Sequence, residues 1–418
     1  MTTRLDDEGV ATMPPLQPQR FLGLAIFIGS ASWIAAFVAM NTVLIPARLE
    51  LVAPDQKVAL VATLTAIGAV VSLLATIAFG AFSDLTRSRL GRRTPWILAG
   101  AIGTFASTLF IMNVTSGSAM VVGWALFQFC LAAIVAPMVT IIPDRVTEER
   151  RGSYSSIYGV SMMVGGAIGG IVASRFIADP QQGMLVIGIV VLLGGPIFVL
   201  LAPDASNLKQ PREAFSGRML IHNFSIPLKN SRDFYFALVG KLLFVIGTFS
   251  ITGYQLYILT DYIGASAEQA GNTIALMSMI NLVLGALFAG VSGVISDRFR
   301  RRKIFVVAAA GILVVGTLFP FLIAEPWAML VFAAFSGVGG GVFNAVDQAV
   351  NYDVLPDPET AAKDLGILNM ANTGGQALGP AIASGAVALT ATFGSVFVVS
   401  AISLGLSGLA IKMIRKSS

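Results

Sequence analysis

The sequence repeats one apolar half, with the same charged motif at the same place in each copy. A glycine, followed by a serine–aspartate pair, ends a long apolar run at Gly80 to Asp84 and again at Gly293 to Asp297. The two aspartates lie 213 residues apart, and arginines follow each of them within a few residues. The same offset relates two proline–aspartate pairs farther along, Pro143-Asp144 and Pro356-Asp357. A half that is written twice, with its charged ends in register, indicates an internally duplicated membrane protein.

Composition excludes several classes of protein. Of the 418 residues, 56% are hydrophobic and 12% are charged, whereas a soluble domain carries about 25% charged residues. Cys130 is the only cysteine and His222 the only histidine, which excludes an intramolecular disulfide, a metal cluster and a Ser-His-Asp hydrolase. The basic residues lie beside apolar runs, so no nucleic-acid partner is expected, and neither is a cofactor or a metal. The first twenty residues show no cleavage pattern of a signal peptide.

Twelve apolar runs are long enough to cross a bilayer, which takes about 20 helical residues. In the first half they cover roughly 21–45, 57–82, 96–115, 119–142, 154–177 and 183–202. In the second half they cover roughly 234–260, 271–295, 304–324, 327–352, 366–390 and 393–414. Lipid cannot satisfy exposed backbone groups, and no alternating strand pattern occurs, so these runs predict helices. The expected fold is an all-α integral membrane protein with twelve transmembrane helices in two six-helix halves.

The basic residues predict the orientation, because Lys and Arg accumulate on the cytoplasmic side. With the N-terminus inside, cytoplasmic segments hold 23 of the 27 Lys and Arg residues, and external segments hold three. We therefore expect a multi-pass protein of the cell (plasma or inner) membrane with both termini in the cytoplasm. The expected parts are a tail at 1–20, a half at 21–202, a cytoplasmic connector at 203–233, a half at 234–414 and a tail at 415–418.

The two charged motifs resemble those of the major facilitator superfamily, which carries a Gly-x-x-x-Asp-Arg-x-Gly-Arg-Arg type motif between spans 2 and 3 and a degenerate copy between spans 8 and 9. The matching residues are Gly80, Asp84, Gly91, Arg92 and Arg93 in the first copy, and Gly293, Asp297, Arg298, Arg301 and Arg302 in the second. The first copy inserts Thr86–Leu90, and this longer form is similar to the sucrose and glycoside–cation symporter branch. The stretch from Asp353 to Gly366 strengthens that likeness. The resemblance implies the major facilitator fold, with spans 1, 4, 7 and 10 around a central cavity.

We interpret the motif residues as a gate. Asp84 is expected to accept hydrogen bonds from the N-terminus of a neighbouring helix. Arg92 and Arg93 are expected to pair with acidic residues on facing loops, such as Asp144, Glu148 and Glu149. A simpler interpretation is that these arginines only fix the orientation.

Two charged residues lie inside spans, where an unpaired charge is costly. Lys241 in span 7 and Asp347 in span 10 are expected at similar depths, about 10–12 Å from the cytoplasmic edge at helical rise. We predict that they pair and that Asp347 carries the coupling proton. Snorkelling of Lys241, or a structural bond of Asp347 to a neighbouring helix, would explain them equally.

Uncharged polar and aromatic residues inside spans are candidates for lining the cavity. The candidates are Trp33, Asn41, Gln128, Tyr254, Gln255, Asn344, Gln348, Asn372 and Gln376. Asn369 and Tyr257 belong to the same inventory. Such amides and aromatic rings suit a hydroxyl-rich solute, and they also suit hydrogen bonding between helices.

The sequence therefore predicts a secondary active transporter that works by alternating access. We expect proton-coupled uptake of a sugar, glycoside or other small polar solute, with a monomer sufficient. Proton-coupled efflux of drug-like compounds is the alternative, although the glycine-rich run at 165–170 lacks the proline of the antiporter motif. The sparse titratable residues argue against an intramembrane enzyme. The missing Gly-x-x-x-x-Gly-Lys-Ser/Thr loop argues against ATP hydrolysis.

Overall fold

A computed structural model describes residues 20–208, 231–299, 302–355 and 361–415, apart from the side chains of Asp297 and residues 361–363. The tail before residue 20, Arg301, Asp357 and most of the connector, with His222, lie outside the described residues. Described elements are helical, as expected for a chain whose backbone must be satisfied within lipid.

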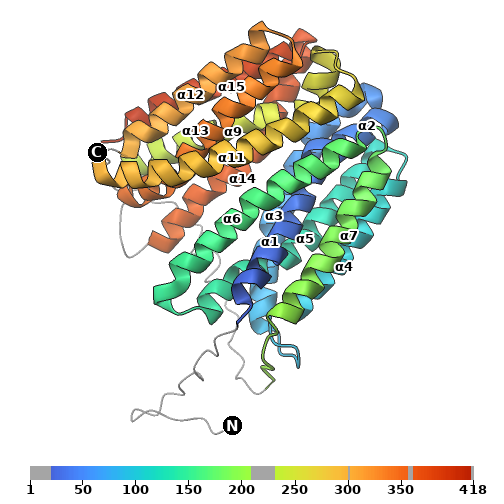
Figure 1. Cartoon of the computed structure of the whole chain (residues 1–418), viewed down its shortest axis with the longest axis vertical. Helices are drawn as coiled ribbons and strands as arrows, with labels where there is room; N and C mark the ends of the chain where they lie inside the picture. The colour runs from blue at the N-terminus through green and yellow to red at the C-terminus, as the bar shows by residue number, and fades with distance from the viewer. Residues whose placement is uncertain (1–19, 209–230, 300–301, 356–360, 416–418) are drawn as a thin grey trace.

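The first half contains six long helical spans (Figure 1). Span 1 combines α1 (Leu22–Ala39), a π-helical turn η1 (Met40–Leu44) and α2 (Ile45–Val52). The others are α3 (Lys57–Leu85, after the short turn η2, Pro54–Gln56), α4 (Thr94–Asn113), α5 (Gly117–Arg145), α6 (Glu148–Ala173, continued by η3, Ser174–Phe176) and α7 (Pro180–Leu201). Local chemistry sets the starts: Ser116 and Asp179 accept N–H bonds from the first turns of α5 and α7.

The second half repeats this order. Its spans are α9 (Arg232–Thr252) continued by α10 (Gln255–Tyr257) and π-helical η4 (Ile258–Tyr262), then α11 (Ala267–Phe299), α12 (Arg302–Leu322), α13 (Pro326–Asp353), α14 (Ala361–Thr390) and α15 (Gly394–Lys412). Each predicted apolar run overlaps one of these spans.

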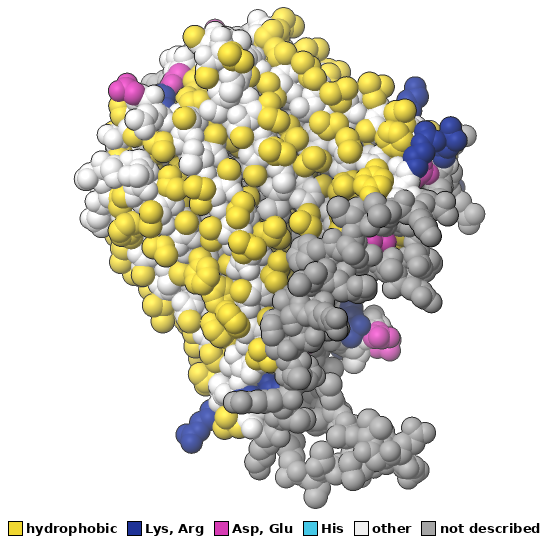
Figure 2. All heavy atoms as spheres, turned by 180° about the vertical axis from the view of Figure 1, so that it is seen from behind, with side chains coloured by type: hydrophobic (Ala, Val, Ile, Leu, Met, Phe, Trp, Pro, Cys, Tyr) yellow, Lys and Arg dark blue, Asp and Glu magenta, His cyan; other side chains and the backbone are white. Residues whose placement is uncertain are grey.

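Among the described residues, eleven helical spans are long and apolar enough to cross a membrane. The remaining one, α14, has 30 residues and a length of about 45 Å at helical rise. Three amide side chains, Asn369, Asn372 and Gln376, interrupt its apolar sequence. Helix α14 is therefore less hydrophobic than a typical membrane span. Hydrophobic side chains cover the visible face between charged margins (Figure 2), as a bilayer requires.

Close packing of α1 on α6 depends on glycine. A Cβ at Gly165 would lie 2.7 Å from Ala31 Cα, and a Cβ at Gly169 would lie 2.8 Å from Ala35 Cα. Neither neighbour can move, because both atoms are backbone. Glycine at positions 165 and 169 therefore allows the close approach of α6 to α1.

The structure corrects the register of the repeat. The helix pair α4–α5 and the helix pair α12–α13 carry equivalent ion pairs, Arg93–Asp144 and Arg302–Asp353, each spanning 51 residues. Asp353, rather than the expected Asp357, therefore takes the place of Asp144. The reason is a longer loop between α3 and α4 than between α11 and α12, which changes the offset after the first motif.

Candidate functional site

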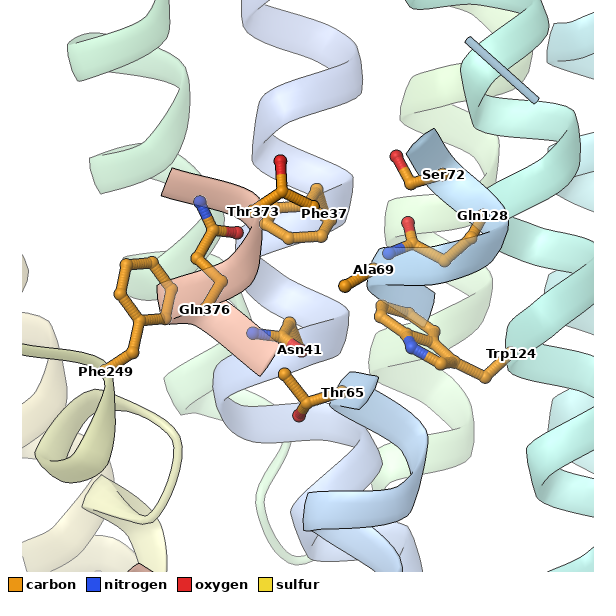
Figure 3. A pocket seen from close by; sticks show the side chains of 10 residues that line it. All are labelled: Phe37, Asn41, Thr65, Ala69, Ser72, Trp124, Gln128, Phe249, Thr373 and Gln376. Atoms are coloured by element: carbon orange, nitrogen blue, oxygen red, sulfur yellow. The ribbon is translucent and has the colours of Figure 1, made fainter. Parts of the chain in front are cut away.

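A small cavity of about 80 Å³ lies between the two halves (Figure 3). Its lining combines amides, hydroxyls and aromatic rings: Phe37, Asn41, Thr65, Ala69, Ser72, Trp124, Gln128, Phe249, Thr373 and Gln376. Figure 3 shows Gln376 and Thr373 of α14 facing Asn41 of span 1. Both halves thus supply polar groups to one space.

A larger cavity of about 300 Å³ lies on the side of the second half. It shares Phe249 and Gln376 with the small cavity and is otherwise lined by Phe244, Val245, Thr248, Leu313, Ser336, Gly340, Phe343, Asn344 and Asn372. Phe244 and Phe343 stack with ring centroids 3.6 Å apart. Among the described residues, neither lining contains Asp, Glu, Lys or Arg.

Local sequence shapes the small cavity. Asn41 lies in the π-helical turn η1, a distortion that is frequent at functional sites. Trp124 stacks on Phe127 with centroids 5.0 Å apart, and its indole faces Gly68, where a Cβ would collide with it. Glycine at position 68 is therefore what lets the Trp124 ring reach α3.

Five of the nine predicted lining residues belong to the cavities: Asn41 and Gln128 line the smaller, Asn344 and Asn372 the larger, and Gln376 both. The other four lie outside the linings. Trp33 is 8% exposed within the packed core, and Gln255 starts the short helix α10. The Tyr254 hydroxyl lies within hydrogen-bond distance of two backbone acceptors, Val58 O (2.9 Å) and Pro380 O (3.0 Å). Gln348 is exposed one helical turn from Asn344.

Sequence reasoning missed several lining residues. Thr65, Ala69 and Ser72 of α3 follow one helical face, with spacings of four and three. Trp124 lies about 10 Å along α5 from the first residue of that helix, deeper than the membrane interface where tryptophan is usual. The spacing on α3 was readable in the sequence, whereas Trp124 looked like an aromatic residue of the core.

The halves are joined at the end of the molecule that holds Lys57, called here the Lys57 end. Lys57 Nζ lies 2.6 Å from Asp261 Oδ2 of the other half, 2.5 Å from Glu50 Oε2, and 4.8 Å from the centre of the Tyr257 ring. Tyr257 also donates to Pro46 O at 2.8 Å. Tyr257, expected near the cavity, thus closes this end instead.

The opposite end carries the arginine-rich motifs and is called here the basic end. Asn344, Gln348 and Asn369 are exposed along α13 and α14 in the direction of this end. These exposed polar side chains lie between the larger cavity and the basic end.

The ion pair expected inside the second half is present. Lys241 Nζ lies 2.7 Å from Asp347 Oδ2, with side-chain exposures of 2% and 10%. Asn351 donates to the same carboxylate oxygen at 2.9 Å, and Asn369 Oδ1 accepts from Lys241 at 3.3 Å. Counted from the ends of α9 and α13, the two residues lie about 13 Å and 9 Å along their helices. The pair sits between the cavity and the basic end.

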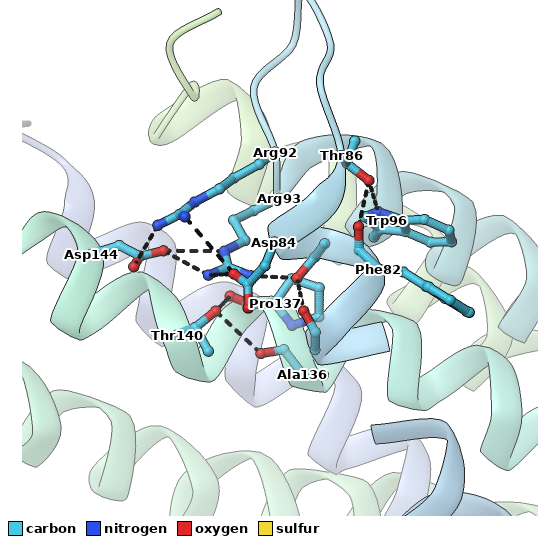
Figure 4. A network of polar contacts seen from close by, with 12 residues as sticks. Phe82, Asp84, Thr86, Arg92, Arg93, Trp96, Ala136, Pro137, Thr140 and Asp144 are labelled. Atoms are coloured by element: carbon cyan, nitrogen blue, oxygen red, sulfur yellow. Dashed lines mark hydrogen bonds and ion pairs between the residues drawn. The ribbon is translucent and has the colours of Figure 1, made fainter. Parts of the chain in front are cut away.

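The first charged motif forms a network within the first half (Figure 4). Arg93 Nη2 lies 2.7 Å from Asp84 Oδ1 and 3.0 Å from Asp144 Oδ2, and Arg92 Nη2 lies 2.7 Å from Asp144 Oδ1. The carboxylate of Asp84 pairs with these arginine side chains, whereas the sequence predicts a hydrogen bond to the N-terminus of a neighbouring helix. Of the three acidic partners expected for the arginines, Asp144 takes the role, whereas Glu148 lies 3.5 Å from Arg151.

The loop of this motif is held by the start of the connector. Asp204 accepts from the Arg93 backbone N–H at 3.3 Å and pairs with Arg145 at 3.1 Å. Asn207 accepts from the Ser88 backbone N–H at 2.9 Å. Gly91 has φ of 82°, a left-handed conformation that favours glycine.

Other motif residues are placed as follows. Arg302 Nη1 lies 2.9 Å from Asp353 Oδ1. Gly80 and Gly293 have open space where a Cβ would project, so neither is required for packing here. Arg301 and the side chain of Asp297 lie outside what the structure describes.

Two repeated six-helix halves around a polar cavity, with a buried ion pair beside it, define a transporter architecture. The chain belongs to the Major Facilitator Superfamily, whose family model matches residues 22–271 and 238–417. The described helices thus have the multi-pass architecture of this transporter family.

Curated relatives from bacteria match part of the chain. An "Uncharacterized transporter BU588" of Buchnera aphidicola is 23% identical over 206 residues, or 48% of each protein. "Multidrug resistance protein MdtH" of Shigella dysenteriae is 26% identical over 154 residues, or 36% of each protein. The chain thus spans half or less of the length of these relatives.

Solved structures share the fold over nearly the whole chain. The nucleoside transporter NupG has a TM-score of 0.73 at 14% identity, covering 94% of this chain and 98% of that one. A bacterial homologue of the human lysosomal transporter Spinster, in an inward-facing and unoccupied conformation, has a TM-score of 0.64 at 15% identity, covering 95% of each. At these identities the likeness shows the fold alone.

Proposed function

We propose that this protein is a secondary active transporter that takes up an uncharged, hydrogen-bonding solute, such as a sugar or glycoside, together with protons. The observation that carries the proposal is the lining of the two cavities, which offers amides, hydroxyls and aromatic rings and no charged side chain among the described residues. Hydroxyl groups of a solute can both donate to and accept from such amides.

The same lining argues against charged solutes. A carboxylate or ammonium group taken from water into this space would find no opposite charge in the lining. Moving an unpaired charge into the middle of a membrane helix bundle costs about 2.5–3.5 kcal/mol even on insertion scales. A sugar needs no such compensation.

Proton coupling is assigned to Asp347. Its carboxylate is 10% exposed and pairs with Lys241, on the path from the larger cavity to the basic end. Protonation would remove the negative charge and release Lys241, and a proton gradient could thereby bias the two conformations. The basic end faces the cytoplasm in this proposal, because most Lys and Arg residues lie there. The conformation described would then be open to the cytoplasm.

Efflux of drug-like compounds is the second candidate. The partial match to a multidrug resistance protein and the aromatic walls formed by Phe244, Phe249 and Phe343 favour it. Uptake is preferred, because so many polar groups in the lining would remain unsatisfied against an apolar compound.

The test is a binding screen of the purified protein by thermal shift against sugars, nucleosides, organic acids and cationic drugs. The proposal expects stabilisation by uncharged polyhydroxylated compounds, lost in Gln128→Glu and retained in Gln255→Glu, whose site lies outside the linings. Stabilisation by cationic drugs together with none by sugars or nucleosides would favour efflux instead.

A further inference from the structure

Helix α14 carries a polar face that reaches from the ion pair to both cavities. Asn369, Asn372, Thr373 and Gln376 have spacings of three, one and three residues, which puts them on one side of a helix. Gln376 lines both cavities, Asn372 the larger and Thr373 the smaller. Asn369 lies about 10 Å from Gln376 along the helix axis. One face of one helix therefore touches the solute space and the charged pair.

The same helix lies against both halves. It packs on α9 of its own half and on α3 of the other half. A Cβ at Gly375 would lie 2.6 Å from Val245 Cβ, and a Cβ at Gly379 would lie 2.8 Å from Ile246 O. Helix α14 is therefore packed closely on α9, which carries Lys241.

Lys241 has acceptors on two helices. Asp347 of α13 accepts at 2.7 Å and Asn369 of α14 accepts at 3.3 Å. Lys241 is 1% exposed, so it cannot turn to water when one acceptor is lost. Asn351 touches the same carboxylate from α13 itself, the helix that carries Asp347.

We propose that Asn369 is a positioning residue: it receives the Lys241 ammonium when Asp347 is protonated, and so ties the proton state of α13 to the helix that lines the solute cavities. This inference rests on the proposed proton coupling. With Asp347 ionised, Lys241 stays on the carboxylate. With Asp347 neutral, the Lys241 ammonium moves toward Asn369 Oδ1. A solute bound to Asn372 and Gln376 holds α14 in the position in which Lys241 and Asn369 can form this hydrogen bond. Proton and solute then favour each other reciprocally.

The charged groups on the helices around Asp347 leave Lys241 as its ion-pair partner. On α13 and α12, Asp353 pairs with Arg302 at 2.9 Å. On α9, Asp233 accepts from the Arg415 backbone N–H at 3.1 Å. Among the side chains that the structure describes, the remaining charges on packed helices are Arg232 on α9, Lys303 on α12, buried Asp364 on α14, and Glu268 and Arg298 on α11. Within the described chain, Lys241 is the charged group in ion-pair contact with Asp347.

The first arm of the test needs no solute. Melting temperatures of the purified full-length protein are measured at about pH 7.5 and about pH 3, a range that includes the ordinary aspartate pKa of about 3.9. Between these two values Asn369→Leu should lose about 2 °C or more beyond the wild-type loss, because acid leaves its Lys241 without an acceptor. Asn369→Asp should lose less than wild type. Asn351→Leu is the matched control and should show no extra loss in acid.

Equal acid losses in Asn369→Leu, Asn351→Leu and wild type would overturn the inference, and so would a loss in Asn369→Leu that is the same at both pH values.

The second arm uses sucrose as the probe in vesicles with a pH gradient. Asn369→Leu should keep sucrose counterflow while its gradient-driven accumulation falls at least about tenfold, the effect of losing roughly 1.4 kcal/mol of coupling. Gradient-driven accumulation unchanged from wild type would also reject the role. If the wild type accumulates no sucrose, the assigned solute class fails, and the melting series still decides on Asn369.

Discussion

Removing one partner of the Lys241–Asp347 pair should cost far more stability than the pair itself contributes. At 2.7 Å the gross Coulomb attraction is about 6 kcal/mol with an effective dielectric constant near 20. Desolvation of two buried groups offsets most of that gain. A single neutralisation leaves a buried, uncompensated charge, which costs about 3–5 kcal/mol. Neutralising both partners removes the charge problem altogether.

We therefore expect Lys241→Gln and Asp347→Asn each to destabilise the second half, and the double variant to be more stable than the sum of the two changes by about 2 kcal/mol or more. The measurement is unfolding of the purified variants by a denaturing detergent in mixed micelles. The pair Arg302–Asp353 gives a matched control, because its side chains are 33% and 29% exposed. Its cycle should give a coupling of about 0–1 kcal/mol.

Additive losses at Lys241 and Asp347 would refute this reasoning. Such a result would mean that each charge finds its own compensation, for example through water entering from the basic end. A coupling as large at Arg302–Asp353 as at Lys241–Asp347 would likewise show that burial does not set the magnitude.

Three further changes test other parts of the structure. Lys57→Asp should open the Lys57 end and raise the labelling of cysteines introduced there. Adding Asp261→Lys should restore closure. Labelling that neither change affects would show that the Lys57–Asp261 ion pair does not hold this end closed. Gly169→Leu should lower the melting temperature by several degrees, at roughly 2–4 °C per kcal/mol, because α1 backbone lies where the side chain would go, whereas Gly159→Leu, with open space around it, should not. Asp84→Ala should slow transport with little change in solute affinity, and an equilibrium affinity that collapses at normal turnover would show that the motif is no gate.

Much of the fold followed from the sequence because membrane spans obey a simple rule. Runs of apolar residues must be helical, and each of the predicted runs overlaps a helical span. The charged pair was also predictable, since two opposite charges at equal depth have few alternatives to each other. The register error at Asp357 came from loop length, which apolar patterning does not constrain.

The cavity was harder to predict, because the facing of each residue depends on helix rotation. Asn41 and Gln128 were recognised by their polarity, whereas Trp124 and Phe249 were not distinguishable from aromatic residues of the core. Tyr254 and Tyr257 looked like solute contacts, but their hydroxyls donate to backbone carbonyls of the other half or of α14. Helix distortions such as η1 leave no periodic signature in the sequence.

The most direct test of the account is solute-induced proton movement in vesicles that contain the purified protein. Sugars, nucleosides, organic acids and cationic drugs are added in turn while internal pH is recorded. The account predicts that an uncharged, hydroxyl-bearing compound moves protons with it, and that Asp347→Asn abolishes this movement while leaving binding of the same compound intact. Proton movement driven by charged compounds alone, or undiminished in Asp347→Asn, would contradict it.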